Sequence, residues 1–86
     1  MLDDEMMYIL KSEIRFHIIL SLKDSKKSPK ELTSQKFYIT HISSNLNDLL
    51  KKGYVKCLNP NKRKNKKFTL TGKSKKIVKK LNNLTK

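Results

Sequence analysis

Apolar side chains recur at steps of three and four residues in the middle of the chain. This spacing places them on one stripe of a helix of about 13 residues, as expected where one face of a helix packs on a core. The stripe consists of Ile39, Ile42, Leu46, Leu49 and Leu50. Two lysines and Gly53 predict the end of this helix, since glycine adopts the left-handed capping conformation without strain. Residues 54–58 then alternate and favour a strand.

A second helical pattern covers residues 3–23. Apolar residues repeat every four positions there, at Met6, Leu10, Ile14, Ile18 and Leu22. Ser12 is a favourable N-cap, so the segment is either one helix or a short helix over residues 3–10 followed by another. A single helix would project its first part and leave four apolar side chains available to a partner subunit, namely Leu2, Met6, Met7 and Ile9.

Between these two patterns lies a strong helix start. Ser28 stands at a cap position, Pro29 at the first helical position, and Glu31 three residues after the serine, which is the capping-box pattern. We expect a short helix to about Gln35 and a turn over residues 36–39 into the next helix. Two short helices joined by about four residues form a helix-turn-helix pattern.

A β-hairpin and a final helix are predicted for the C-terminal part. Asn59 and Pro60 break the first strand, residues 62–67 are too charged to be buried, and residues 68–70 resume a strand. Thr71 can cap a last helix, whose apolar face would carry Ile77, Val78, Leu81 and Leu84. A very short third strand is conceivable near residues 25–28. The expected fold is α+β and mainly α.

The composition of the chain adds a large and unevenly placed positive charge. The 86 residues suit a single domain (1–86) with a small core, and the net charge is +14. Residues 1–50 hold seven basic and seven acidic side chains, whereas residues 51–86 hold 13 lysines, Arg63 and no acid. This asymmetry indicates a polyanion partner, most simply nucleic acid. The alternative is a lysine-rich bias with a merely solvated surface.

Several classes of function are not expected. A single cysteine, Cys57, excludes an intramolecular disulfide and a cysteine-based zinc site, and it suits a reducing cytoplasm. The chain has no apolar run of about 20 residues and an acidic N-terminus unlike a signal peptide. No nucleophile–base pair, glycine-rich phosphate loop or metal-ligand spacing is present. We therefore expect a cytoplasmic protein that is no enzyme and needs no cofactor, metal or small-molecule ligand.

Four motifs in the same order and spacing carry a resemblance to a known family. They are RFHIILSL at residues 15–22, SPKEL at 28–32, ISSNL with LLKKGYV over 42–55, and FTLTGK at 68–73. Together they resemble small prokaryotic winged helix-turn-helix transcription regulators of the ArsR/MarR/PadR type. The resemblance implies a three-helix core, a β-hairpin wing and a C-terminal helix. It also implies a homodimer that binds double-stranded DNA and usually represses promoters at palindromic sites.

The same resemblance assigns site residues. A recognition helix over about residues 40–52 would enter the major groove, and a basic wing over residues 59–67 would bind the backbone or minor groove. Base contacts would come from Thr40, His41, Ser43, Ser44 and Asn47, whose short hydrogen-bonding side chains fall largely off the apolar stripe. Backbone contacts would come from Lys51, Lys62, Arg63, Lys64, Lys66 and Lys67. Tyr38 and Tyr54, which flank the helix, are expected to pack.

Some features depart from the family, and some alternatives stay open. Thr33 and Lys36-Phe37 replace the alanine and glycine usual in the second helix and turn, and the cysteine or histidine clusters of metal-sensing members are missing. With no arginine on the recognition helix, we expect modest specificity and a preference for A·T-rich sites. The dimer would form through the N-terminal or the last helix. The alternative function is a non-specific or RNA-binding module of a larger nucleoprotein complex.

Overall fold

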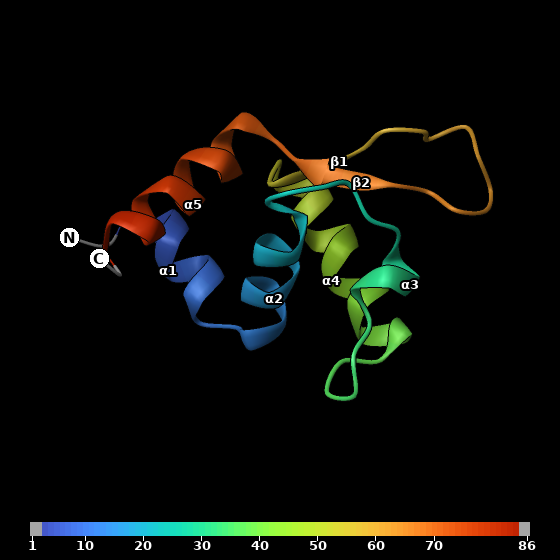
Figure 1. The fold of residues 1–86 in the computed structure, drawn as a ribbon, viewed down its shortest axis with the longest axis horizontal. Helices are drawn as coiled ribbons and strands as arrows, with labels where there is room; N and C mark the ends of the chain where they lie inside the picture. Colours follow the sequence, from blue (N-terminus) through green and yellow to red (C-terminus); the bar gives the residue numbers. More distant parts are fainter. Residues whose placement is uncertain (1–2, 85–86) are drawn as a thin grey trace.

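Helices precede and follow a two-stranded antiparallel hairpin in the computed structural model, which describes residues 3–84 (Figure 1). The elements are α1 Asp4–Leu10, α2 Glu13–Leu22, α3 Pro29–Leu32, α4 Ile39–Lys51, β1 Val55–Cys57, β2 Phe68–Leu70 and α5 Gly72–Leu84. The fold is thus α+β and mainly helical, in an order consistent with a winged-helix-like topology. No helix within residues 3–84 is long and apolar enough to cross a membrane.

Two separate helices form the N-terminal part, as the Ser12 cap allowed. Asp3 accepts a hydrogen bond from the Met6 amide at 2.9 Å, and the Ser12 hydroxyl accepts one from the Arg15 amide at 3.4 Å. Each cap satisfies an amide that has no partner inside its helix. Because α1 folds back onto α2, Met6 is buried in the core rather than projecting, and so is Ile9. Leu2 lies outside the described residues.

Helix α3 begins where the capping box predicted but ends at Leu32, three residues before the expected Gln35. The Ser28 amide donates to Glu31 Oε1 at 2.9 Å, and the Glu31 amide donates to the Ser28 hydroxyl at 3.3 Å. The early end has a local cause. Thr33 is extended, and the Ser34 hydroxyl accepts hydrogen bonds from two amides of the following turn, at 3.2 Å each. Such side-chain bonds compete with continuation of a helix.

Helix α4 spans 13 residues, as its apolar stripe predicted, and ends in a Schellman motif. The Tyr54 amide donates to the Leu49 carbonyl at 2.9 Å, and the Gly53 amide donates to the Leu50 carbonyl at 3.1 Å. Gly53 has φ +83°, the left-handed conformation that this motif requires. The predicted apolar stripe, however, includes more residues than the core buries. Ile39 and Leu50 remain 46% and 40% exposed, and only the middle of the stripe is buried.

The hairpin pairs Val55 with Leu70 and Cys57 with Phe68. The third strand considered near residues 25–28 does not form. A single β-bridge is found there, in which Lys27 and Phe68 exchange backbone hydrogen bonds of 3.0 and 2.8 Å. Beyond β2, the Thr71 carbonyl accepts the first helical bond of α5, from the Lys75 amide at 3.0 Å. The Thr71 hydroxyl serves another purpose, because it donates to the Gly53 carbonyl at 2.7 Å.

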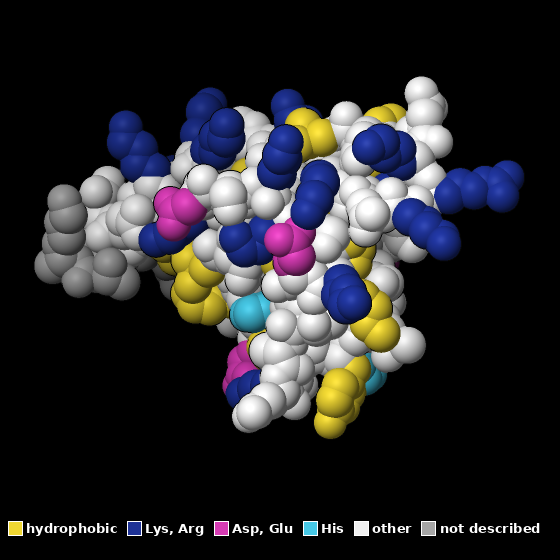
Figure 2. Space-filling view, turned by 45° about the vertical axis from the view of Figure 1, so that its right-hand side comes forward, with side chains coloured by type: hydrophobic (Ala, Val, Ile, Leu, Met, Phe, Trp, Pro, Cys, Tyr) yellow, Lys and Arg dark blue, Asp and Glu magenta, His cyan; other side chains and the backbone are white. Residues whose placement is uncertain are grey.

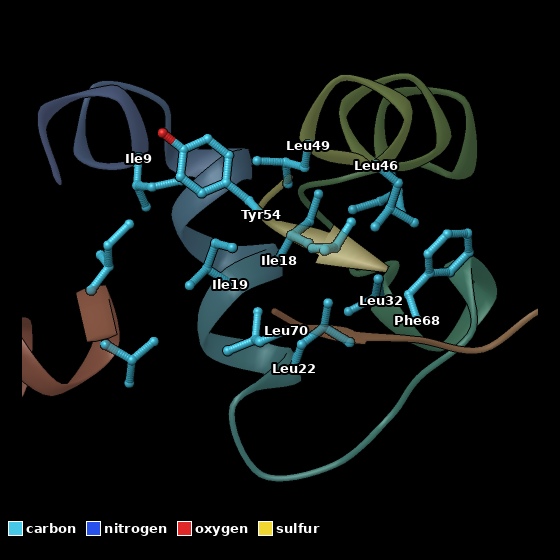
Figure 3. Close-up of a cluster of buried hydrophobic side chains, with 14 of the residues drawn as sticks. Ile9, Ile18, Ile19, Leu22, Leu32, Leu46, Leu49, Tyr54, Phe68 and Leu70 are labelled. Carbon is cyan, nitrogen blue, oxygen red and sulfur yellow. The ribbon is translucent and has the colours of Figure 1, made fainter. Parts of the chain in front are cut away.

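The core lies around α2, which packs against α1, α4, α5 and β2. Its side chains Ile18, Ile19 and Leu22 belong to a buried cluster that has members from every other element (Figure 3). The remaining core side chains are Met6, Ile9, Leu32, Ile42, Leu46, Leu49, Tyr54, Val55, Phe68, Leu70, Ile77 and Val78. Leu81 is half-buried against this cluster, while the side chain of Leu84 lies outside the described part. The exposed face of α4 is therefore supported by a packed layer.

Gly53 and Gly72 provide a matched pair for testing the end of α4. A Cβ on either glycine would meet nothing within 4 Å, but only Gly53 has a positive φ. We expect Gly53→Ala to lower the free energy of unfolding by about 1–2 kcal/mol, because of its left-handed backbone. Gly72→Ala should raise it by up to about 1 kcal/mol, because alanine favours a helix. Urea denaturation of both variants measures these changes; equal effects would contradict the capping role.

Candidate nucleic-acid interface

Helix α4 presents a row of polar side chains away from the core. Thr40, Ser44, Asn47 and Lys51 are exposed and follow one another at steps of four, three and four residues. At about 3.6 residues per turn this spacing aligns them along one face, opposite the buried Ile42, Leu46 and Leu49. Four of the six α4 residues predicted as contacts therefore form one continuous strip.

A groove runs between α4 and the hairpin loop, which we define as residues 59–67. Its volume is about 290 Å³. Ser43 and Asn47 line it from α4, and Arg63 and Lys66 line it from the hairpin loop. The remaining lining residues are Pro29, Leu46, Asn65 and Phe68. The fold thus brings uncharged hydrogen-bonding groups and cations from distant parts of the sequence to one hollow, which we call the α4 groove.

His41 does not join this constellation. It is exposed on α4 but is absent from the lining of the α4 groove, and the helical periodicity places it on the flank away from Ser43. Its carbonyl accepts a hydrogen bond of 2.9 Å from the Asn45 side-chain amide. Asn45 is therefore engaged with its own helix, whereas the Asn47 side chain makes no hydrogen bond within residues 3–84. Of the two asparagines, Asn47 is the one available to a ligand.

Asn59 and Asn65 order the hairpin loop. The sequence did not predict either of them as a site residue. Asn59 Oδ1 accepts from the Lys67 amide at 2.8 Å, and Asn59 Nδ2 donates to the Asn65 carbonyl at 3.2 Å. Asn65 adopts a positive φ of 58°, which asparagine tolerates better than most residues. The Asn-Pro pair had indicated only a break. These bonds fix the base of the hairpin loop, while Lys62, Arg63 and Lys64 are exposed.

Lys67 differs from the other cations of the hairpin loop because it forms an ion pair within residues 3–84 and they do not. Its ammonium lies 2.5 Å from Glu31 Oε1, at the start of α3. This contact, with the capping bonds from Ser28, lowers the pKa of Glu31 from an ordinary 4.5 to about 2. Lys67 therefore connects the hairpin to α3, and the exposed Lys62, Arg63 and Lys64 lie nearer the tip of the hairpin loop. Figure 2 shows lysine and arginine side chains gathered over the upper part of the side of the molecule that it displays.

The two tyrosines beside α4 have opposite surroundings. Tyr54 is buried and stacks on Tyr8 with ring centroids 5.4 Å apart, as packing predicted. The prediction for Tyr38 is wrong, because its side chain is 65% exposed at the start of α4. With Ile39 it borders an open hollow of about 460 Å³, whose other lining residues are Lys30, Thr33 and Ser34. The short α3 leaves this corner uncovered.

The other histidine and the cysteine serve the fold. His17 Nε2 donates to the Leu32 carbonyl at 2.7 Å, and its ring lies 5.0 Å from that of Phe37, so it joins α2 to the α3–α4 turn. Cys57 is half-buried against the core. Within residues 3–84 no group of three histidine, cysteine or acidic side chains is placed to hold a metal ion.

Comparison of the chain with known protein families, with curated proteins and with solved structures finds no match. The surface of α4 and the hairpin loop is therefore the structural basis for inferring a function. Its three features are a strip of short polar side chains, a groove shared with cations, and an exposed aromatic corner.

The Glu31–Lys67 ion pair predicts an acid dependence of stability. Because the pKa of Glu31 is lowered in the folded state, its contribution is complete above about pH 4.5 and is lost as the pH falls toward 2. We expect Glu31→Gln, which retains a capping side chain, to show a smaller fall in Tm between pH 5 and 2 than the wild type. Asp24→Asn removes an exposed loop carboxylate and is the control. A full wild-type fall in the Gln variant would show that the pair does not form in solution.

Proposed function

We propose that this protein is a winged helix-turn-helix regulator that binds double-stranded DNA, in the manner of the ArsR/MarR/PadR-type proteins that its motifs resemble. In this proposal α3 and α4 form the helix-turn-helix, α4 is the recognition helix and the hairpin loop is the wing. The protein acts in the cytoplasm as a homodimeric repressor of transcription. It needs no cofactor and catalyses no reaction.

The α4 groove is the observation that supports this proposal best. Short uncharged side chains such as Ser43 and Asn47 suit the edges of base pairs, and the cations Arg63 and Lys66 suit phosphates. Both kinds of group line one hollow, so a duplex could meet base-reading and backbone-binding groups together. The exposed strip of α4 continues this surface to Lys51, and the tip of the hairpin loop continues it to Lys62 and Lys64.

The chemistry of α4 argues for a preference for A·T-rich sites. Asn47 can form the two hydrogen bonds that asparagine makes with adenine, whereas Asn45 is occupied by the His41 carbonyl. No arginine stands on α4 to bind guanine in the same way. Ile39 and Tyr38, exposed at the start of the helix, offer apolar surface to a thymine methyl group.

A homodimer is proposed through the end of the molecule opposite the hairpin loop. There α1 and α5 lie side by side, so the two helices first considered as alternative interfaces form a single surface (Figure 1). Met7 and Leu10 remain partly exposed on α1 and would be covered in a dimer. A two-fold axis at this end would direct two copies of α4 at the halves of a palindrome.

A second candidate is a non-specific or RNA-binding module. It is favoured by the position of the charge, because the cations stand on the hairpin loop and α5, and α4 itself carries only Lys51. Such a protein would bind phosphates by charge and shape with little reading of bases.

A binding titration by fluorescence anisotropy separates the two candidates. It compares a duplex from the region upstream of the protein's own gene with a shuffled duplex of equal composition, over a series of salt concentrations. A specific regulator should prefer the native duplex by ~100-fold or more at moderate salt, with two subunits per site. Equal affinities that collapse together with salt would support the second candidate, and RNA would be the next ligand.

Asn47→Ala and Asn45→Ala make a matched pair for the base contact. On the preferred duplex we expect Asn47→Ala to weaken binding by about 5- to 150-fold, the equivalent of 1–3 kcal/mol for a bidentate contact. Asn45→Ala should change affinity little, because its amide binds within α4. Unchanged binding by the Asn47 variant would refute the assignment of this residue.

The hairpin loop should govern the salt dependence of binding. Each phosphate contact contributes a slope of about −0.9 to the plot of log K against log salt. Replacing Lys62, Arg63 and Lys64 together by Gln should therefore flatten the slope by up to about 2.7. Replacing Lys11, Lys56 and Lys76, which form no ion pair within residues 3–84, removes the same charge elsewhere. Equal slopes for the two triple variants would exclude the hairpin loop as the phosphate site.

A further inference from the structure

The two edges of α5 differ in their electrostatic surroundings. On one edge, Lys80 lies 2.9 Å from Asp3 Oδ2 and Lys73 lies 4.0 Å from Glu5 Oε2. The contact with Lys80 is the main cause that lowers the pKa of Asp3, and the contact with Asp3 raises the pKa of Lys80. Acids of the N-terminal segment thus partly neutralise this edge.

The other edge of α5 carries cations without such partners. Lys75 and Lys79 stand one helical turn apart and border a hollow of about 220 Å³ together with Lys23, at the end of α2. We call these three residues the lysine cluster. None of them forms an ion pair within residues 3–84, and neither does Asp24, the acid next to Lys23 in the chain. Within residues 3–84, three positive charges therefore border one hollow and none of them is ion-paired.

The lysine cluster is separate from the α4 groove. The two hollows share no lining residue. Helix α5 packs on α2 and β2, whereas α4 is followed by β1 and packs on it. In Figure 1, α5 lies on the left of the hairpin strands and the hairpin loop extends to the right, along the longest axis of the molecule. A straight duplex seated on α4 and the hairpin loop would leave the cluster uncovered.

We propose that the lysine cluster is a second phosphate-binding surface, which takes a second segment of double-stranded DNA while α4 and the hairpin loop hold the first. The protein would thereby bridge two duplex segments. This inference rests on the proposed function, because it takes the second ligand to be of the same kind as the first. Flexible lysines suit it, since they hold phosphates as point charges without reading sequence.

The floor of the hollow argues against a membrane surface as the partner. Its apolar lining residues, Leu70 and Val78, are both buried in the core. Insertion into a bilayer interface requires exposed apolar side chains beside the cations, and none lines this hollow. A charged and polar rim over a buried apolar floor fits the phosphates of a nucleic acid.

A capture assay tests this inference. An unlabelled duplex is immobilised and saturated with the full-length protein, and retention of a second, fluorescent duplex is then measured. With three phosphates held, capture should fall about 40-fold between 50 and 200 mM salt. The test variant is Lys23→Gln, Lys75→Gln and Lys79→Gln together. The matched control is Lys11→Gln, Lys56→Gln and Lys76→Gln, which loses the same charge. Thermal melting verifies that both variants fold.

We expect the cluster variant to bind the first duplex within about twofold of wild type and to lose capture of the second, while the control retains both. Bridging through the two recognition helices of a dimer would survive in the cluster variant, so retained capture overturns the inference. Wild-type protein that binds one duplex but captures no second also overturns it, with the proposed function intact. Wild-type protein that binds no duplex refutes both. If the wild type captures no second duplex but binds phosphatidylserine vesicles, and the cluster variant loses that vesicle binding, the cluster is assigned to membranes instead.

Discussion

The carbonyl groups of Gly53 and Tyr54 receive the hydrogen bonds that join the end of α4 to the start of α5. The Thr71 hydroxyl donates to Gly53 at 2.7 Å, and the fully buried Ser74 hydroxyl donates to Tyr54 at 2.5 Å. Leaving such a buried acceptor without a donor would cost about 1–3 kcal/mol. Because the hairpin is the chain between these two points, the bonds close it into a loop with a fixed base. The angle between α4 and the hairpin loop, and hence the α4 groove, depends on this corner.

A layer of aromatic rings and cations extends the same corner to the N-terminal helices. Tyr8 stacks on Tyr54, the Arg15 guanidinium lies 4.0 Å from the Tyr8 ring centroid, and Lys73 lies 4.2 Å from that of Tyr54. Each cation meets the negative face of a ring, which favours its presence close to other positive charges. Lys73 also donates to the Lys52 carbonyl at 3.1 Å, where the end of a helix carries partial negative charge. Thus α1, α4 and α5 meet at one place.

Sequence patterns predicted the elements well where local rules decide them. The caps at Ser12 and Ser28, and the glycine after α4, act through neighbouring backbone groups and were readable in advance. Exposure at Tyr38 was not, because it depends on how far α3 extends, and the Ser34 bonds shorten that helix. The candidate site was predictable by residue type but not by arrangement. Only the folded hairpin brings Arg63 to Asn47, and only helix geometry separates His41 from both.

The fold partly offsets the charge asymmetry of the sequence. Three acids of the balanced half, Asp3, Glu5 and Glu31, reach across to lysines of the half that has no acid. These lysines hold α5 and the hairpin against α1 and α3, so part of the apparent excess is structural. Among the cations that form no ion pair within residues 3–84, one group lies on the hairpin loop and another along the outer edge of α5. A uniformly basic surface would attract polyanions without orientation, whereas separated patches on a packed core favour particular positions of a ligand. The pairing of acids in the fold, as well as the total charge, therefore determines where positive charge is left exposed on the surface.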